Sequence, residues 1–520
     1  MVAALEEFLW IVVLAFVFGF VMAFGIGAND VANAFGSSVS AGSLSLGAAM
    51  IIAPIMEFLG AISIGAQVTK TVRNEIFDLD AYEDEPSVLM FGELCALVTA
   101  SMWLLLATAY QLPVSTTHTI IAALIGFSIA AKGFDSIVWW EETGKIFIAW
   151  VAAPCMAGTI SFIFFGTLKY TILVASNPFE RAVYAFPVVV FIGIGANMWF
   201  ILNKINNVEL DNYIKGVATP IAVGTAGLFA LITLFILVPY LKKKVQEQHD
   251  NEEEEAAVVE AKDKTNADGS DEEEVAAEKP ASTDVTEAKT LNDGISTSFD
   301  TTTSDENMSL SEWFAKNTYK RDLRRESLSE SARAHQIWET QALYDKRTEN
   351  LFQYLQVFTA CLASFAHGGN DVANAIGPLS GILAIYRDGS AEPKSPVYTW
   401  VLAYGGAGLA LGFIFFGYNI IKAVGFKLTS ITPSKGFCIE LAASLAVSVA
   451  SYCKIPVSTT QCLVGATCGA GLAAGGVSQV DWMFFFRTLF GWAFTFFAAA
   501  FFNAGFFSFC YYSPGYYGTN

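Results

Sequence analysis

Long apolar stretches separated by short polar ones run along most of this 520-residue chain. Many of them approach the ~20 residues with which an α-helix crosses the hydrocarbon core of a bilayer. Their recurrence predicts an all-α polytopic membrane protein and argues against a soluble protein with a large core. We expect about 12 transmembrane segments, at residues 8–33, 45–68, 89–111, 113–131, 143–170, 183–202, 217–241, 352–375, 397–421, 434–453, 455–473 and 482–511.

The central part of the chain, residues 245–350, breaks this pattern. It is rich in charged residues, Ser and Thr, and has few aromatic residues before Trp313. Such a segment buries too little apolar surface to fold alone, so we predict that it is largely disordered, with some helix from about Leu310. The pattern therefore divides the chain into an N-terminal membrane half (1–244), an acidic loop (245–350) and a C-terminal membrane half (351–520).

Composition and charge support this division. Hydrophobic residues make up 54% of the chain and charged residues 15%. The formal net charge is −19, but the loop alone, with 27 acidic and 12 basic residues, accounts for −15 of it. The charge therefore says little about a transported species. The eight Cys are scattered through apolar segments without CxxC spacing, so we expect reduced, packed side chains and neither disulfides nor metal ligands.

The distribution of basic residues predicts the orientation in the membrane. Lys242–Lys244 lead into the loop, and Lys346 and Arg347 follow it. Because basic residues favour the cytoplasmic side, we expect a cytoplasmic loop. Met1–Phe8 and Tyr511–Asn520 contain no Lys or Arg, which indicates that both termini are extracellular. No basic transit segment precedes the first apolar stretch, so the plasma membrane is the expected location.

Two polar motifs occur twice inside the apolar segments. GANDVANAFG at 27–36 returns as GGNDVANAIG at 368–377, and PVSTT at 113–117 returns at 456–460. From the Asp of the first motif to the Ser of the second is 85 residues in one copy and 87 in the other. Polar residues are costly within a membrane and typically mark an ion or substrate pathway. The duplication predicts two related halves that meet at a central site, as in secondary transporters.

The number of segments between the copies predicts how the halves are related. If every segment crosses the membrane, the segments that open the repeats are seven crossings apart and run in opposite directions. The repeats are therefore predicted to be inverted. The short segments that begin at Pro113 and Pro456 carry a polar cluster near one end, which suits broken or re-entrant hairpins that line a cavity.

The first motif supplies carboxylate and amide oxygens, which suit hard cations. Its Asp and second Asn are three residues apart and share a helical face. In a single copy, close packing of small residues between helices would explain the motif, but two copies at matched spacing favour an ion or substrate site. The candidate ligands are Asn29, Asp30, Asn33, Asn370, Asp371 and Asn374, with Asp30 and Asp371 as the expected cation ligands.

The second motif supplies hydroxyl groups and, if a helix starts there, free backbone N–H groups that can seat an anion. A single copy would more simply be a helix N-cap. Neither motif contains Lys or Arg, and burying an unpaired ion costs of order 20 kcal/mol in the idealised case. We therefore infer that cations accompany the anion. The candidate anion ligands are Ser115, Thr116, Thr117, Ser458, Thr459 and Thr460.

Other polar residues within the apolar segments are secondary candidates for the pathway. Two glutamates precede the S-T-T motifs by 22 and 18 residues, and a third has no counterpart in the other half and could serve one half only. These secondary candidates are Glu57, Glu93, Glu440, Gln67 and Asn419. His118 and Gln461 differ between the copies, and a hydrogen-bonded structural role for His118 is favoured over a titrating one.

With these motifs the chain resembles the inorganic phosphate transporter (PiT) family. The resemblance rests on GANDVANAFG, GELCALV, PVSTTHTII, SFAHGGNDVANAIGPLSG and PVSTTQCLVGATCGAG, and it covers about residues 10–244 and 350–510. It implies sodium:phosphate symport by alternating access in an often dimeric, inverted-repeat transporter. It further implies that Asp30 and Asp371 hold sodium, that the S-T-T hydroxyls hold phosphate, and that no cofactor or nucleic acid takes part.

Several alternatives stay open at this point. A carboxylate binds protons as well as sodium, so proton coupling is one of them, and sulfate or a divalent-metal phosphate complex could replace phosphate. From another functional class, the protein could be a phosphate sensor or receptor that signals through its acidic loop. The chain has no GxSxG, Walker A or HExxH motif, so we do not expect an enzyme.

Overall fold

The computed structural model describes residues 7–202, 208–267, 323–392 and 395–513. In these residues the regular structure is helical, apart from one isolated bridge between Phe77 and Ile137. The prediction of an all-α protein is therefore confirmed. Helix α9 (Val238–Ala267) runs through the predicted boundary at residue 244, so the first part of the acidic segment is helical and not an unstructured continuation. Residues 268–322 lie outside the described part of the chain.

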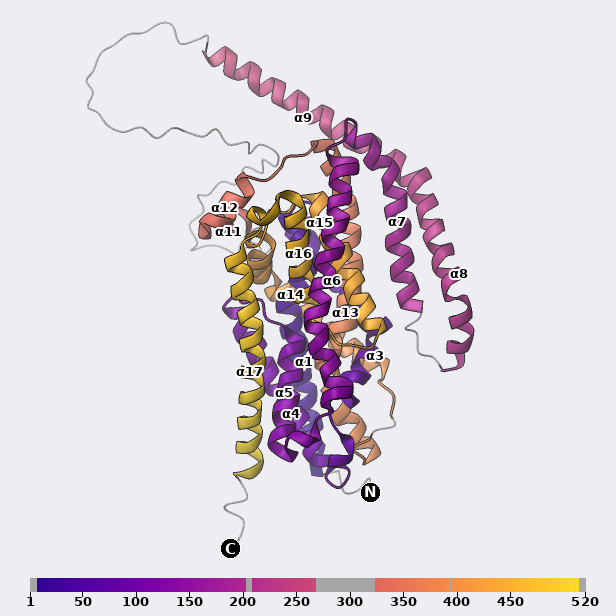
Figure 1. Cartoon of the computed structure of the whole chain (residues 1–520), viewed down its shortest axis with the longest axis vertical. Coiled ribbons are helices and arrows are strands. Elements are labelled where there is room, and N and C mark those ends of the chain that lie inside the picture. Colours follow the sequence, from indigo (N-terminus) through magenta and orange to yellow (C-terminus); the bar gives the residue numbers. More distant parts are fainter. Residues whose placement is uncertain (1–6, 203–207, 268–322, 393–394, 514–520) are drawn as a thin grey trace, which may run out of the picture.

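The remaining elements are given in chain order, and Figure 1 shows their arrangement. They are α1 (Leu9–Asn29), α2 (Val31–Ser40), α3 (Leu46–Asn74), η2 (Leu79–Tyr82), α4 (Pro86–Ala109), α5 (Thr116–Lys132), η3 (Phe134–Ser136), η4 (Trp139–Thr143), α6 (Gly144–Leu168), η5 (Lys169–Leu173), α7 (Pro178–Leu202), α8 (Val208–Ile232), η6 (Thr233–Leu237), α11 (Leu323–Glu330), α12 (Ala332–Glu339), α13 (Lys346–Asp388), α14 (Thr399–Lys427), α15 (Pro433–Tyr452), α16 (Thr459–Gly475), η8 (Gly476–Gln479) and α17 (Trp482–Tyr512).

Each of the 12 expected segments coincides with a helix, but fewer qualify as membrane spans. Among the described residues, nine helical stretches are long and apolar enough to cross a bilayer: Leu9–Ser40, Leu46–Asn74, Pro86–Ala109, Gly144–Leu173, Pro178–Phe200, Val217–Asn251, Thr399–Tyr418, Pro433–Tyr452 and Trp482–Tyr512. The other three expected segments lie in α5, α13 and α16. Helices α5 and α16 have only 17 residues each, and α13 carries the polar GGND motif.

Two helical hairpins carry the PVSTT motifs. The connection between α4 and α5 contains Gln111 with φ 56°, and the one between α15 and α16 contains Lys454 with φ 61°. Both residues precede the Ser of the motif by four positions, so the two turns use the same left-handed step at the same place. In Figure 1 the α4–α5 hairpin occupies the lower half of the bundle and the α15–α16 hairpin the upper half.

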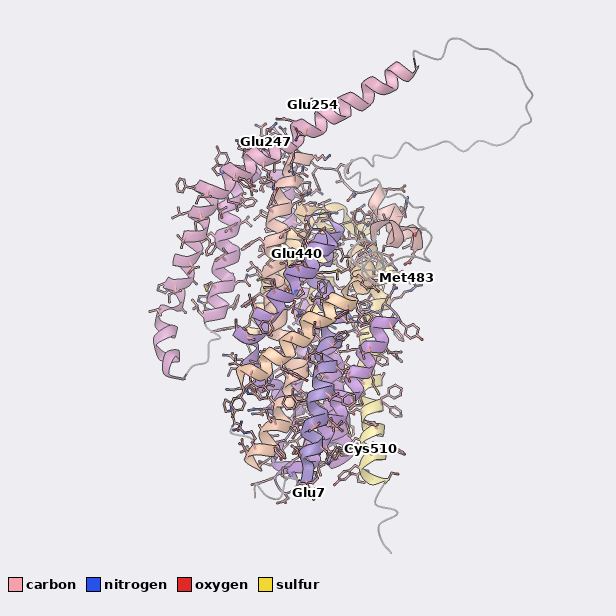
Figure 2. The ribbon with its side chains drawn as sticks, turned by 180° about the vertical axis from the view of Figure 1, so that it is seen from behind. Glu7, Glu247, Glu254, Glu440, Met483 and Cys510 are labelled. Carbon is pink, nitrogen blue, oxygen red and sulfur yellow. The ribbon has the colours of Figure 1, made fainter. Side chains whose placement is uncertain are left out.

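The chain ends and the acidic segment lie at opposite ends of the molecule. Figure 2 shows Glu7 and Cys510 at one end, whereas Glu247 and Glu254 lie on α9 beyond the other end. Helices α11 and α12 share the end from which α9 projects (Figure 1). This relative placement agrees with termini on one side of a membrane and the loop on the other.

Small residues allow the central helices to pack closely. A Cβ at Gly27 of α1 would overlap the Leu409 carbonyl of α14, and a Cβ at Gly412 of α14 would overlap the Phe24 carbonyl of α1. Helices α3 and α13 meet in the same way, where Gly368 faces the Glu57 carbonyl. Such backbone contacts are typical of membrane helix interfaces. The outer face of α17 is instead covered by exposed phenylalanines: Phe490, Phe497, Phe501 and Phe509.

Candidate functional site

Asp30 lies at the junction of α1 and α2, where the chain continues as one helical stretch because the Asp30 backbone is helical and its N–H donates to the Ile26 carbonyl. Its side chain is buried. Thr116 Oγ1 donates a hydrogen bond to Asp30 Oδ2 at 2.6 Å, and Thr460 Oγ1 donates to Oδ1 at 3.0 Å. These two threonines come from different S-T-T motifs, so one carboxylate joins both halves of the chain.

Asp371 is the corresponding residue of the second copy and lies inside helix α13. Thr459 Oγ1 donates to Asp371 Oδ2 at 2.9 Å, which matches the bond from Thr116 to Asp30. Asp371 also has a basic neighbour, because His367 Nε2 lies 3.0 Å from Oδ2. Ligand atoms of Asp30, His367 and Asp371 all lie within 4.8 Å of one another. We call these three residues the central cluster; two carboxylates this close suit a cation.

Two of the four asparagines expected as ligands, Asn29 and Asn370, hold the hairpins in place. Asn29 Nδ2 donates to Thr108 Oγ1 and to the Leu112 carbonyl, at 3.1 and 3.0 Å, and Asn29 Oδ1 accepts from Val114 N at 3.2 Å. Because the amide group of Asn29 is already engaged by these hydrogen bonds, Asn29 positions the first S-T-T motif in this conformation.

The contacts of Asn370 repeat this arrangement in the second half. Asn370 Nδ2 donates to the Val457 carbonyl at 2.9 Å and to Asp371 Oδ1 at 2.6 Å, and its Oδ1 accepts from Ser451 Oγ at 3.3 Å. Ser451 and Thr108 both precede the motif serine by seven positions. The two halves thus tie their hairpins to the first motif at equivalent residues.

The hydroxyl groups of the S-T-T motifs divide into two kinds. The serines, Ser115 and Ser458, are N-caps of α5 and α16, because they accept from the backbone N–H groups three residues on. Three of the four threonines, Thr116, Thr459 and Thr460, donate to the cluster carboxylates, whereas Thr117 Oγ1 donates to the Val457 carbonyl at 3.2 Å. Asn374 also reaches them, with Nδ2 donating to Thr116 Oγ1 at 3.2 Å and to Thr117 Oγ1 at 3.1 Å. The backbone of Asn33 belongs to α2, but its side chain lies outside the described residues.

His367 is a site residue that the sequence analysis did not single out. Its Nδ1 lies 2.7 Å from Glu57 Oε2, and Ser364 Oγ donates to Glu57 Oε1 at 2.7 Å. His367 therefore links Glu57 to Asp371. The signal was a histidine directly before GGND, where the first copy has Ile26. Glu57, which has no counterpart in the other half, contacts a histidine that has none either.

The other secondary candidates lie apart from these contacts. Glu440 Oε1 accepts from Ser37 Oγ at 2.7 Å and from Ser38 Oγ at 2.6 Å, and Thr359 Oγ1 donates to its Oε2 at 2.8 Å. Figure 2 labels Glu440 inside the upper half of the bundle. Glu93 is buried, and among the described residues its Oε2 has no hydrogen-bond partner.

Three further polar residues from the sequence analysis are Gln67, Asn419 and His118. Gln67 is buried, and the side chain of Asn419 lies outside the described residues. The His118 ring packs on Trp150 in a tilted arrangement, with ring centroids 3.7 Å apart. Among the described residues neither ring nitrogen of His118 has a hydrogen-bond partner, so the ring is held by packing and not by the hydrogen bonds that the sequence analysis expected.

Little free space remains beside the central cluster. A cavity lined by His367, Thr459, Ala34 and Ser444, among others, has a volume of about 20 Å³. Such a volume holds about one water molecule, so this cavity has no room for phosphate in the described conformation. A transported ion needs a further conformation in which this space opens.

Comparisons with known proteins agree with the geometry. Residues 26–503 match the model of the phosphate transporter family. The chain is 30% identical to the phosphate-repressible phosphate permease pho-4 of Neurospora crassa, covering 94% of this chain and 95% of the permease. It is 30% identical to sodium-dependent phosphate transporter 1-A of Danio rerio, covering 94% and 93%.

A solved structure described as the sodium-dependent phosphate transporter has a similar fold. The TM-score is 0.70 at 26% identity, over 96% of this chain and 98% of that one. The family match spans both copies of the polar motifs and the helices that bring them together. This chain is a member of the phosphate transporter family.

Proposed function

We propose that this protein imports inorganic phosphate in symport with sodium ions, by alternating access around the central cluster. The observation that carries the proposal is Asp30, whose carboxylate accepts hydroxyl hydrogen bonds from the S-T-T motifs of both halves. Two relatives, one known by sequence and one by structure, are named sodium-dependent phosphate transporters. The proposed sodium ligands are Asp30 and Asp371, and the proposed phosphate ligands are the S-T-T groups.

The hydrogen bonds suggest how the two ions depend on one another. Thr116, Thr459 and Thr460 now donate their hydroxyls to the carboxylates. A sodium ion at the carboxylates would occupy the same oxygens and release these hydroxyls. The hydroxyls could then donate to phosphate, beside the N-terminal N–H groups of α5 and α16. Sodium would also neutralise the carboxylates, whose charge otherwise repels the anion. Binding of the two ions would therefore be cooperative.

The two halves, residues 1–244 and 351–520, are the proposed inverted repeats. The matched turns at Gln111 and Lys454 support this, as do the equivalent bonds of Asn29 and Asn370 to their hairpins. We further propose re-entrant α4–α5 and α15–α16 hairpins, extracellular termini and a cytoplasmic acidic segment in the plasma membrane. A homodimer, expected from the family resemblance, stays a prediction.

One observation favours a second candidate, in which protons replace sodium or accompany it. The contacts from Glu57 through His367 to Asp371 form a continuous chain of titratable groups that reaches the cluster. Histidine is the side chain that most readily exchanges a proton near neutral pH. The two candidates predict different uptake when sodium and pH are varied independently.

Labelled-phosphate uptake into cells that lack their own phosphate carriers tests the proposal. We expect uptake in sodium medium, little in choline medium, and at least a ~100-fold loss in Asp371→Asn, since a charge-bearing ligand is removed. Asp135→Asn, which changes an exposed loop carboxylate, is the matched control and should behave as wild type. Equal uptake in both media that rises with acidity would favour protons. A lack of uptake by protein detected at the cell surface would refute phosphate transport.

A further inference from the structure

A larger cavity with a mixed apolar and polar lining lies at the end of the molecule that carries α11 and α12. Its volume is about 490 Å³, within the roughly 300–1,000 Å³ typical of small-molecule sites. Its walls come from the α4–α5 connection at Tyr110–Val114, the first half of α17, and the junction of α11 and α12 at Glu330 and Ser331. Figure 2 labels Met483, a residue of this wall, beside the α11–α12 segment. We call this space the vestibule.

The vestibule adjoins the central cluster. Pro113 and Val114 line it, and both belong to a PVSTT motif. The backbone N–H of Val114 donates to Asn29, and two residues further on Thr116 donates to Asp30. A single short piece of chain therefore separates the vestibule from the proposed transport site. The vestibule lies on the side of the cluster that faces the acidic segment.

The lining of the vestibule offers groups that recognise an oxyanion. Lys427 and Arg487 bring positive charge to its walls. Thr495 also lines it, with only 1% of its side chain exposed, and among the described residues Thr495 Oγ1 has no hydrogen-bond partner. The Nε1 of Trp103, another wall residue, also has none there. A buried polar group without a partner is costly, but neither atom has accessible surface in this conformation, so an anion in the vestibule reaches Thr495 Oγ1 only after a local shift of the wall. The accessible groups that favour an oxyanion are the cations Lys427 and Arg487.

Two acidic residues share these walls, but both are already engaged. Asp481 accepts from Phe484 N at 3.0 Å and caps α17. Glu330 Oε2 lies 3.1 Å from Lys427 Nζ, in a pair whose side chains are 45% and 21% exposed. Ion pairs with this much solvent access are weak, so an oxyanion of higher charge can take the place of Glu330 at Lys427.

Glu330 belongs to a segment that is docked on the transporter. Arg333 Nη2 donates to the Ser478 carbonyl at 2.8 Å, and Trp338 Nε1 donates to the Phe426 carbonyl at 3.0 Å. Ile337 is buried against the bundle. The last part of the acidic segment thus forms one wall of the vestibule and presents a carboxylate that competes for one of its cations.

We propose that the vestibule is a second binding site for inorganic phosphate, between the central cluster and the side of the acidic segment. Arg487, Lys427 and Thr495 are its ligands, and Glu330 competes with phosphate for Lys427. The site deepens the proposed function and rests on it, because a phosphate that leaves the cluster toward this side passes the vestibule. The proposal also gives the docked segment that carries Glu330 a role in transport: it sets how tightly the vestibule holds phosphate.

Equilibrium binding of radiolabelled phosphate to the purified full-length protein in sodium buffer tests the site by its stoichiometry. Wild type should bind two phosphates per chain, and Asp371→Asn should weaken only the tighter class of site. Arg487→Gln and Thr495→Val should each weaken the other class about tenfold or more, as expected for loss of a hydrogen bond to a charged ligand. Glu330→Gln should tighten that class by several fold, and Arg487→Lys should restore part of the affinity.

Lys243→Gln is the matched control, since Lys243 is a highly exposed cation on α9 outside the vestibule. It should leave both classes unchanged. One phosphate per chain in wild type, unaltered by Arg487→Gln and Thr495→Val, would overturn the vestibule site and leave the proposed transport intact. If wild type bound no phosphate and showed no uptake, the proposed function itself would be refuted. Thr495→Val preserves side-chain volume. If Arg487→Gln failed to fold, the phosphate binding of Thr495→Val would still test the vestibule site.

Discussion

The two copies of the GxND motif share their sequence but differ in their surroundings. Asp30, at the junction of α1 and α2, receives hydroxyl hydrogen bonds from both hairpins. Asp371, in α13, receives one hydroxyl hydrogen bond, from its own hairpin, and contacts His367. The first copy therefore connects the two halves of the chain, whereas the second contacts the titratable pair His367 and Glu57. The same motif thus has different partners in the two halves.

The largest expected effect separates these two aspartates. Asp30→Asn keeps the size of the side chain but removes the charge that both hairpins share. We expect phosphate uptake to fall at least ~100-fold, and the apparent sodium affinity of any remaining activity to fall further than in Asp371→Asn. Uptake kinetics at varied sodium, normalised to surface protein, measure both. An Asp30→Asn protein with nearly normal uptake would show that the hairpins do not need this carboxylate.

The second prediction concerns the pair that only the second copy has. Glu57 and His367 contact one another at 2.7 Å, so their roles should be coupled. We expect Glu57→Gln and His367→Gln each to lower uptake about 10- to 100-fold, and the double variant to lose little more than either single one. Ile26→Val, at the position equivalent to His367, is the matched control and should change uptake little. Additive losses would mean that the two residues act independently.

The sequence predicted the helical fold and the membership of the cluster better than it predicted the detailed contacts. Apolar length alone identifies spans such as α4 and α17, because bilayer thickness sets that length. It also selected the segments in α5, α13 and α16, which are not among the nine stretches that qualify as spans: α5 and α16 have 17 residues each, and α13 carries the polar GGND motif. All 12 segments are helical nonetheless, and nine meet the requirements for a span.

The candidate site shows the same limit at the level of single residues. Duplication and polarity identified Asp30, Asp371 and the threonines. Duplication and polarity could not show which polar groups hold the hairpins. Asn29 does so by donating to the Leu112 carbonyl, which lies 83 residues further along the chain. His367 occurs once, so a search for repeated motifs passes over it. Helix α9 shows the same limit. It begins within the apolar span Val217–Asn251 and continues into the acidic segment, and the composition of the acidic segment alone does not predict this continuation.

The smallest expected effect concerns the serines that begin α5 and α16. Ser115 and Ser458 each accept one backbone N–H bond, at 3.1 and 3.3 Å, so replacing either by Ala removes an N-cap worth about 1 kcal/mol. Because the two caps are equivalent, Ser115→Ala and Ser458→Ala should lower the thermal unfolding midpoint of the purified protein by similar small amounts. Their uptake should stay well above that of the aspartate variants.

The serine comparison also separates capping from ligand binding. Thr119, whose hydroxyl bonds the Ser115 carbonyl within its own helix, offers a control, since Thr119→Val removes a hydroxyl near the motif that is not an N-cap. If the serine hydroxyls bound phosphate in another conformation, Ser115→Ala and Ser458→Ala would weaken phosphate affinity tenfold or more at nearly unchanged stability. A shared loss of stability with little change in affinity would instead assign capping to the serines and anion binding to the threonines, in both halves alike.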